Sequence, residues 1–174
     1  LLFYGLNRRL NEQTESRARA RALTFMDPLT GLSSRSAFLT RLQAAITRSR
    51  KGRPFAMMVI ELANLQAVAR GSGPDGVDRA LVLAASRLKR VARDFDTVAR
   101  VDNQHFAVLM ESPCTTDEAN AMATHVVAQG LRESGTLPDG ATLRFHIVLA
   151  MLPLADMNAE STLDELLHEA TLIA

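Results

Sequence analysis

The sequence predicts an α/β domain in which helices flank a mixed central sheet, and two observations support this fold class. Apolar stripes with helical spacing alternate along the chain with short apolar runs of strand length, an order typical of sheets covered by helices. In addition, two β-rich runs at 97–101 and 106–110 enclose Asp102 and Asn103, residues that favour a tight two-residue turn and therefore predict a hairpin.

Each expected element rests on a local pattern of apolar or capping residues. Before the final two helices, Thr115 with Glu118 and Ser161 with Asp164 have the spacing of helix N-terminal caps. A continuous apolar run at 55–60 has the composition of a buried strand. After an N-terminal helix, the expected elements are helix 38–46, strand 55–60, helix 77–92, the two hairpin strands, helix 119–131, strand 143–149 and helix 163–170.

The composition indicates one globular domain. The chain has 174 residues, 47% hydrophobic and 22% charged, which is enough to bury a sizeable core. A formal net charge of +1 argues against a nucleic-acid partner. The single cysteine, Cys114, excludes an internal disulfide and is compatible with a reducing cytoplasm. No stretch approaches the roughly 18 consecutive apolar residues of a membrane span.

Residues 1–26 predict a connector helix in front of a domain at 27–174. Residues 6–26 lack Gly and Pro and are rich in helix-forming side chains, and the helix is expected to end at Asp27-Pro28. The apolar start at 1–6 followed by arginines fits either the cytoplasmic end of an inner-membrane helix or an amphipathic lead-in from a longer protein. We therefore expect a cytoplasmic domain that forms a homodimer through this helix.

Three separated motifs resemble those of the GGDEF (diguanylate cyclase) family. They are Asp27-Pro28-Leu29-Thr30-Gly31-Leu32, Arg35-Ser36-Ala37-Phe38 and the hairpin sequence, and they keep the family's order over about residues 23–174. The resemblance implies a mostly antiparallel sheet of the nucleotide cyclase type. Where the family has Gly-Gly-Asp-Glu-Phe, this chain has Asp102-Asn103-Gln104-His105-Phe106, so only the phenylalanine is retained.

The resemblance implies that the family's magnesium site has been lost. Glu61 matches the first metal-binding acid, whereas Gln104 matches the second and offers only an amide, and His105 replaces the neighbouring acid. Mg²⁺ needs oxygen ligands at short range, so one carboxylate is inadequate for two ions on a triphosphate. We expect these three positions to be vestigial, with no catalytic residue and no metal, and Mg²⁺ only alongside residual GTP binding.

The positions that match the family's GTP-binding residues have also changed. Asp102 and Asn103 bring side chains to positions where glycines let the backbone approach phosphate. Ala69 matches a guanine-reading Asn, and Gln66 matches a phosphate-side Lys. Asp78 retains the second guanine-reading position, although an acid in the first turn of a helix also simply favours the helix dipole. The resemblance therefore implies loss of cyclase activity.

Arg93 and Asp96 resemble the Arg-x-x-Asp inhibitory site at which the family binds cyclic di-GMP. Arginine can fork onto phosphate or guanine acceptors, and a carboxylate accepts from the guanine N–H edge. The same spacing at the end of a helix also gives a local ion pair or a cap. Both interpretations remain open from the sequence.

Three functional hypotheses follow. The leading one is a catalytically inactive regulatory domain that relays a signal to a fused or separate output domain, such as a phosphodiesterase-type (EAL) domain. The second is a cyclic di-GMP receptor that binds through Arg93 and Asp96. The third is a weak diguanylate cyclase or GTP-binding domain that uses Glu61 and Asp78.

Overall fold

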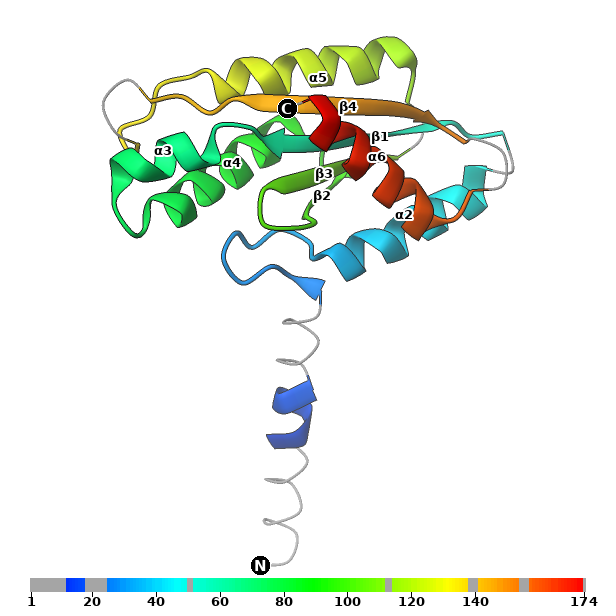
Figure 1. Ribbon diagram of the computed structural model, residues 1–174. Helices are drawn as coiled ribbons and strands as arrows, with labels where there is room; N and C mark the ends of the chain where they lie inside the picture. The colour runs from blue at the N-terminus through cyan, green and yellow to red at the C-terminus, as the bar shows by residue number, and fades with distance from the viewer. Residues whose placement is uncertain are drawn as a thin grey trace, which may run out of the picture.

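The computed structural model shows helices on both faces of a single sheet (Figure 1). It describes residues 12–17, 25–49, 52–111, 114–137, 141–153 and 157–173. From residue 35 the elements are α2 (Arg35–Ser49), β1 (Phe55–Leu62), α3 (Leu65–Ser72), α4 (Gly76–Val91), β2 (Thr97–Arg100), β3 (His105–Met110), α5 (Thr116–Gly130), β4 (Phe145–Leu152) and α6 (Ala159–Ile173).

The N-terminal connector is described only in part. Residues 12–17 are helical, in agreement with the predicted helix, while the rest of that prediction up to residue 24, including the apolar start at 1–6, lies outside the described residues. Among the helices that the structure describes, none has the length and apolar character needed to cross a membrane.

The four strands lie in the order β2-β3-β1-β4, and every neighbouring pair is antiparallel. The prediction of a mostly antiparallel sheet flanked by helices is therefore confirmed. β1 and β2 run in the same direction with β3 between them, and β3 and β4 do so with β1 between them. The sheet is thus a β-α-β-β-α-β unit with additional helices, in which α5 joins β3 to β4.

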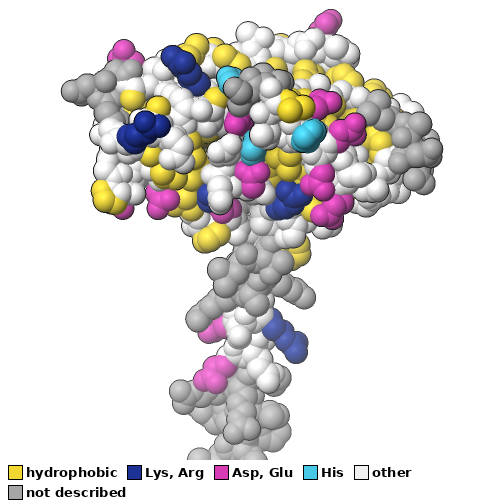
Figure 2. All heavy atoms as spheres, in the orientation of Figure 1, with side chains coloured by type: hydrophobic (Ala, Val, Ile, Leu, Met, Phe, Trp, Pro, Cys, Tyr) yellow, Lys and Arg dark blue, Asp and Glu magenta, His cyan; other side chains and the backbone are white. Residues whose placement is uncertain are grey.

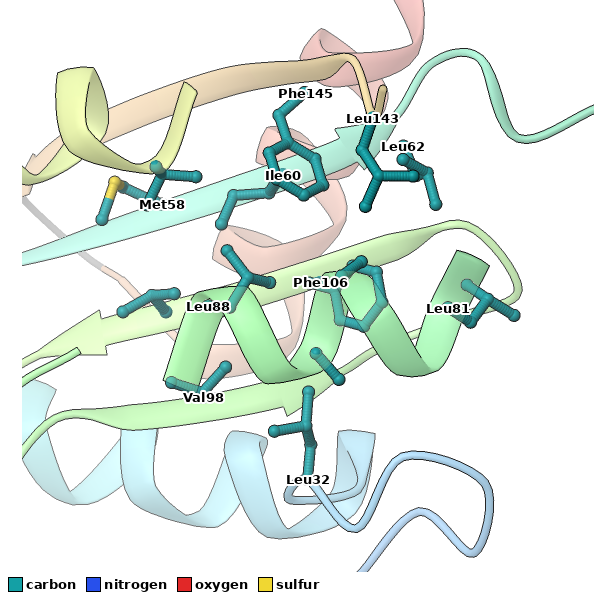
Figure 3. Packing of buried hydrophobic residues seen from close by; sticks show 14 of the residues in the cluster. Leu32, Met58, Ile60, Leu62, Leu81, Leu88, Val98, Phe106, Leu143 and Phe145 are labelled. Atoms are coloured by element: carbon teal, nitrogen blue, oxygen red, sulfur yellow. The ribbon is translucent and has the colours of Figure 1, made fainter. Parts of the chain in front are cut away.

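β1 is the central strand, and its eight residues are all buried. Side chains alternate between the two faces of a strand. Met58 and Ile60 pack with residues of α3, α4 and α5 (Figure 3), whereas Met57 and Val59 pack with residues of α2 and α6. Because helices cover both faces, the strand has a continuous apolar run instead of a polar and apolar alternation.

The structure corrects two local predictions. Helix α3 was not predicted: it has only eight residues, its sequence contains a glycine, and only Leu65 and Val68 are buried in it, so it is shorter than the helices that a sequence pattern usually reveals. The last helix begins earlier than expected: the Asn158 side chain accepts from the backbone N of Ser161 at 2.9 Å, so Asn158 is the cap in place of Ser161. The predicted capping box of Thr115 and Glu118 is confirmed.

Candidate functional site

Glu61 lies in a row of three polar side chains across the middle strands of the sheet. It is directly opposite His105 of β3 and His146 of β4. Residues that are directly opposite point to the same face, which here is the face that Val59 shares with α2 and α6. Glu61 and His105 are only 4% and 6% exposed. The fold thus brings Glu61 and His105, two positions that the sequence matched to the family's metal site, together with a histidine that sequence reasoning had not placed there.

The Glu61 carboxylate has one partnered and one unpartnered oxygen. Gln104 Nε2 donates to Oε1 at 3.0 Å, while Oε2 lies 3.6 Å from His146 Nδ1. Glu61 Oε2, His105 Nε2 and His146 Nδ1 are buried atoms without a hydrogen-bond partner. As the side chains stand, no three His, Cys, Asp or Glu residues in the described part of the chain are arranged to hold a metal ion.

The hairpin between β2 and β3 is confirmed, but its connection is longer than the two residues predicted. Residues 101–104 lie between the strands, and the backbone N of both Val101 and Asp102 donates to the carbonyl of His105, at 3.0 and 3.4 Å. The Asp102 carboxylate accepts from the backbone N of Gln104 at 2.9 Å and of His105 at 2.8 Å. Asp102 therefore forms a side-chain turn, which accommodates the extra residues.

Asp102 also holds the ring of His105, since His105 Nδ1 lies 2.8 Å from the carboxylate Oδ2. This hydrogen bond raises the pKa of His105, partly opposed by burial of the ring. Burial by itself would raise the pKa of Asp102, but the hydrogen bonds from His105 and from the turn amides outweigh it and lower the pKa overall. The two groups are thus a mutually stabilising ion pair when His105 is protonated.

We expect this pair to make stability depend on pH. The raised pKa of His105 contributes stability that is complete below its ordinary value of 6.5 and is lost as the pH rises through the folded value. The lowered pKa of Asp102 contributes stability above its ordinary value of 3.8, which is lost as the pH falls through the folded value. The stability advantage of the wild type over Asp102→Asn should therefore be largest between these limits and should decline toward pH 8. Urea denaturation over this range measures it, with the exposed Asp94→Asn as control; an advantage that is constant with pH would contradict the assignment.

The segment before α2 is tied to the same hairpin. Asp27 accepts from Thr30 N and Thr30 Oγ1 at 2.8 and 2.7 Å, and its Oδ1 lies 3.3 Å from Arg100 Nη1. Ser33 forms a parallel bridge with Ala99 of β2. Gly31, at φ +68, has the left-handed backbone that this turn requires. The motif that begins at Asp27 therefore folds against the base of the hairpin.

The remaining predicted site residues lie elsewhere. Arg93 and Asp96 precede β2, whereas the hairpin follows it, so the two sites are at opposite ends of that strand. Both Arg93 Nε and Nη2 donate to the Asp96 carboxylate at 3.0 Å, and the guanidinium lies 4.5 Å from the ring centre of Phe95. Asp78 is exposed in the first turn of α4, and within the described residues it has no contact that joins it to Glu61.

Comparison with known proteins identifies the fold and the family. Residues 24–171 match the family model described as diguanylate cyclase, GGDEF domain. The chain belongs to the GGDEF family. It is 30% identical over 139 residues to the cyclic di-GMP phosphodiesterase NbdA of Pseudomonas aeruginosa, covering 79% of this chain and 17% of NbdA. It is 33% identical over 102 residues to the diguanylate cyclase DgcP of the same organism, covering 58% of this chain and 15% of DgcP.

Solved structures of GGDEF proteins share the fold. The GGDEF domain of YfiN from P. aeruginosa is 26% identical with a TM-score of 0.73, covering 86% of this chain and 90% of that one. The coiled coil and GGDEF domain of DgcB from Caulobacter crescentus has a TM-score of 0.80 at 18% identity, covering 97% of this chain and 90% of that one. This GGDEF domain thus spans only a small part of its curated relatives but most of the compared structures.

Sequence reasoning missed His146 as a neighbour of Glu61. The residue stands near the start of β4 among apolar residues, and no local pattern around it shows which strand β4 pairs with. The pairing of β4 with β1 places His146 opposite Glu61. The useful signal would have been the β-α-β-β-α-β order, in which the first and last strands lie side by side.

Proposed function

We propose that this chain is a catalytically inactive GGDEF domain that acts as a regulatory relay in a cyclic di-GMP signalling protein. The observation that carries the proposal is the state of the hairpin. The Asp102 carboxylate accepts from the backbone N of Gln104 and of His105. Successive backbone N–H groups in a turn are a common anion-binding feature, so an internal carboxylate already occupies the donors that a phosphate would need.

The pairing of Glu61 supports the same conclusion. Its Oε1 accepts from the Gln104 amide at 3.0 Å, at the position where the family places a second acid. An amide beside the remaining carboxylate supplies one neutral oxygen at most, while two Mg²⁺ ions on a triphosphate need several anionic ligands. The negative charge of Asp102 would further oppose a bound triphosphate.

In this proposal the domain transmits a signal from the connector helix to an output domain. Similarity to the phosphodiesterase NbdA supports an output of the phosphodiesterase (EAL) type. The chain covers 17% of NbdA, so the output domain, anchoring to the inner membrane and homodimerisation through residues 1–26 are all part of the proposal. Light scattering of the chain with and without residues 1–26 tests the dimer: loss of the dimer on truncation supports it, and an unchanged oligomeric state refutes it.

We expect the purified chain to form no cyclic di-GMP from GTP with either Mg²⁺ or Mn²⁺. Product is measured by chromatography, with DgcP assayed in parallel as the active reference. Glu61→Ala should leave the result unchanged, because the carboxylate has no catalytic partner at Gln104. Product from the wild type that disappears in Glu61→Ala would refute the proposal and would establish a weak cyclase.

A second candidate function is reception of cyclic di-GMP beside Arg93. The specific observation is a cavity of about 250 Å³ lined by Ala45, Arg48, Arg53, Phe55, Phe95 and Glu111. Phe95 also lies under the Arg93 guanidinium, so the cavity adjoins the Arg93–Asp96 pair. Aromatic rings and arginines together suit a ligand with planar bases and phosphates. Charges on the face shown in Figure 2 are otherwise interspersed, with no single basic patch among its described residues.

Calorimetric titration of cyclic di-GMP tests this second function. If the site is used, Arg93→Ala and Arg53→Ala should each weaken binding about tenfold or more, since a hydrogen bond to a charged group contributes about 1.5–3 kcal/mol. Arg90→Ala is the matched control, because Arg90 is an exposed arginine close to Arg93 in the sequence. Absence of heat from the wild type would exclude the receptor function and leave the relay alone.

A further inference from the structure

Opposite charges are divided between two neighbouring helices on one face of the sheet. α2 and α6 pack side by side on the face that contains Met57 and Val59 (Figure 1). α2 carries three arginines and no acidic residue, whereas α6 carries one aspartate and three glutamates and no Lys or Arg. The flanking sequence continues this division, because residues 28–60 contain no Asp or Glu and residues 145–174 contain no Lys or Arg. This face of the domain therefore has a basic side and an acidic side.

The two helices neutralise only part of these charges within one copy of the domain. Arg35 Nη2 lies 2.6 Å from Asp164 Oδ1, and no other ion pair joins α2 to α6 among the described residues. Arg41 and Arg48 share the carboxylate of Glu111, which follows β3. The exposed acids of α6 that have no basic partner in the described part of the chain are Glu160, Glu165 and Glu169.

An apolar groove lies beside the arginines of α2. It is lined by Leu39, Thr40, Gln43, Ala44, Thr47 and Arg48. The groove adjoins α6, because the Gln43 side chain accepts from the backbone N of Ala159 at 3.2 Å. On α6, Leu172 is 72% exposed and shares one side of the helix with Glu165 and Glu169, which precede it by seven and three residues. α6 thus presents an apolar side chain beside two carboxylates, and α2 presents an apolar groove beside an arginine.

We propose that this face binds a second copy of the chain, with α2 of each copy against α6 of the other. The chain itself carries both halves of the complementary pair, so a second copy has the charges that each helix requires. A two-fold axis that runs between α2 and α6 places the basic helix of one copy over the acidic helix of its partner, and the same contact occurs twice. Pairing of α2 with α2, or of α6 with α6, is disfavoured because like charges would lie opposite each other. This contact is separate from a dimer through residues 1–26 and does not depend on the relay.

Zero-length crosslinking of mixed isotope-labelled and unlabelled chains locates the contact. Exposed ion pairs are weak individually, and crosslinking captures a weak dimer. Arg48→Lys keeps the charge of α2 and supplies an amine that carbodiimide joins to a touching carboxylate. We expect crosslinked peptides that combine residue 48 of one isotope with α6 of the other. Arg70→Lys is the matched control, because Arg70 is exposed on α3, which packs on the opposite face of the sheet; it should give no crosslink to α6 of another copy.

The isotope mixture separates this contact from a crosslink within one chain. The position of the crosslink separates it from a dimer that forms through residues 1–26. Absence of the mixed-isotope crosslink from Arg48→Lys would overturn the inference, and so would an equal yield from Arg70→Lys.

Exchange of the charges between two variants tests the complementarity directly. One variant carries Glu165→Lys and Glu169→Lys, so both of its helices are basic, and the other carries Arg41→Glu and Arg48→Glu, so both are acidic. In their mixture, carbodiimide should join the amines introduced on α6 of the first to the carboxylates introduced on α2 of the second. Raising the salt from about 0.1 M to about 1 M shortens the screening length from about 10 Å to about 3 Å, so the yield should fall about tenfold or more.

Circular dichroism verifies that both exchanged variants fold. The acidic variant loses the ion pairs with Glu111, and if it does not fold, the Arg48→Lys crosslink and its salt dependence decide the question alone. A mixture of folded variants that gives no crosslink between α6 and α2, or a yield that salt leaves unchanged, would overturn the inference.

Discussion

Phe106→Ala is expected to destabilise the domain by about 3–5 kcal/mol, the usual cost of removing a buried phenylalanine from a core. Phe106 is 0% exposed and belongs to the cluster beneath α4 and α5. Figure 3 shows it in the same layer as Ile60 of β1 and Leu81 and Leu88 of α4. Deletion of its ring would leave a cavity that these neighbours, held in strands and helices, cannot close.

The matched control is Phe95→Ala. Phe95 is 51% exposed, and the Arg93 guanidinium lies 4.5 Å from its ring centre, an interaction that contributes about 0.5–1 kcal/mol at the surface. Urea denaturation of the two variants gives both free energies of unfolding. Similar losses for the two would contradict the packing role. Phe106 is thus a residue that the core needs.

Arg87→Ala is expected to cost about 3 kcal/mol of unfolding free energy. Arg87 is 5% exposed in α4, and its guanidinium donates to the carbonyl oxygens of Gly130 and Arg132 at 2.7 and 2.6 Å. The Gly130 carbonyl ends α5 and also accepts from the backbone N of Leu143 at 2.9 Å, while the Arg132 carbonyl lies just beyond the helix. Each hydrogen bond from a charged donor contributes about 1.5–3 kcal/mol, and Arg87→Ala removes two of them, although Gly130 keeps its bond from Leu143.

Arg87→Lys and Arg90→Ala make this test specific. Lysine keeps the charge but cannot fork onto two carbonyls, so Arg87→Lys should fall between the wild type and Arg87→Ala. Burial lowers the pKa of Arg87 most, and repulsion from the charges of Arg132 and Arg90 lowers it further. Arg90 is exposed, so Arg90→Ala should be neutral or slightly stabilising. A loss from Arg90→Ala equal to that from Arg87→Ala would indicate a general charge effect instead of the two hydrogen bonds.

The elements that the sequence predicted well are those with long apolar patterns. The run at 55–60 became β1, and the stripe from Val77 to Ala92 became α4 with ends shifted by one residue. Helix α3 was missed because it has only eight residues and two buried side chains, which is too short for a sequence pattern to separate it from a loop. The predicted length of the hairpin turn was wrong. The Asp102 side chain accepts from the backbone N of Gln104 and His105, and these hydrogen bonds stabilise a longer loop in place of the tight turn that the residue type favours.

Some residues of the candidate site could be placed from the sequence, and others could not. The resemblance to the family's metal site implied that Glu61 and Gln104 lie near each other, and their hydrogen bond confirms the proximity. His146 could not be placed, because its nearness to Glu61 depends on a pairing between strands more than 80 residues apart. Arg93 and Asp96 left two interpretations open, and the structure shows them joined by two side-chain hydrogen bonds, the arrangement that a ligand would have to open.

The contacts of Asp27 with Arg100 and of Ser33 with Ala99 link the hairpin directly to the segment that follows the connector helix. Ser33 donates to the carbonyl of Val98 at 3.1 Å and accepts from the backbone N of Arg100 at 3.0 Å, so the segment lies along β2, the outermost strand. We expect a displacement at residue 25 to reach the loop of Asp102 through these backbone hydrogen bonds and β2, without crossing the core. Apart from this short contact with Ser33, β2 has a neighbouring strand on one side alone, and such a strand can shift more easily than a central one. Glu61 lies on β1, two strands inward from β2, so a shift of the segment before α2 would need to move only β2 and β3 to change the surroundings of Glu61.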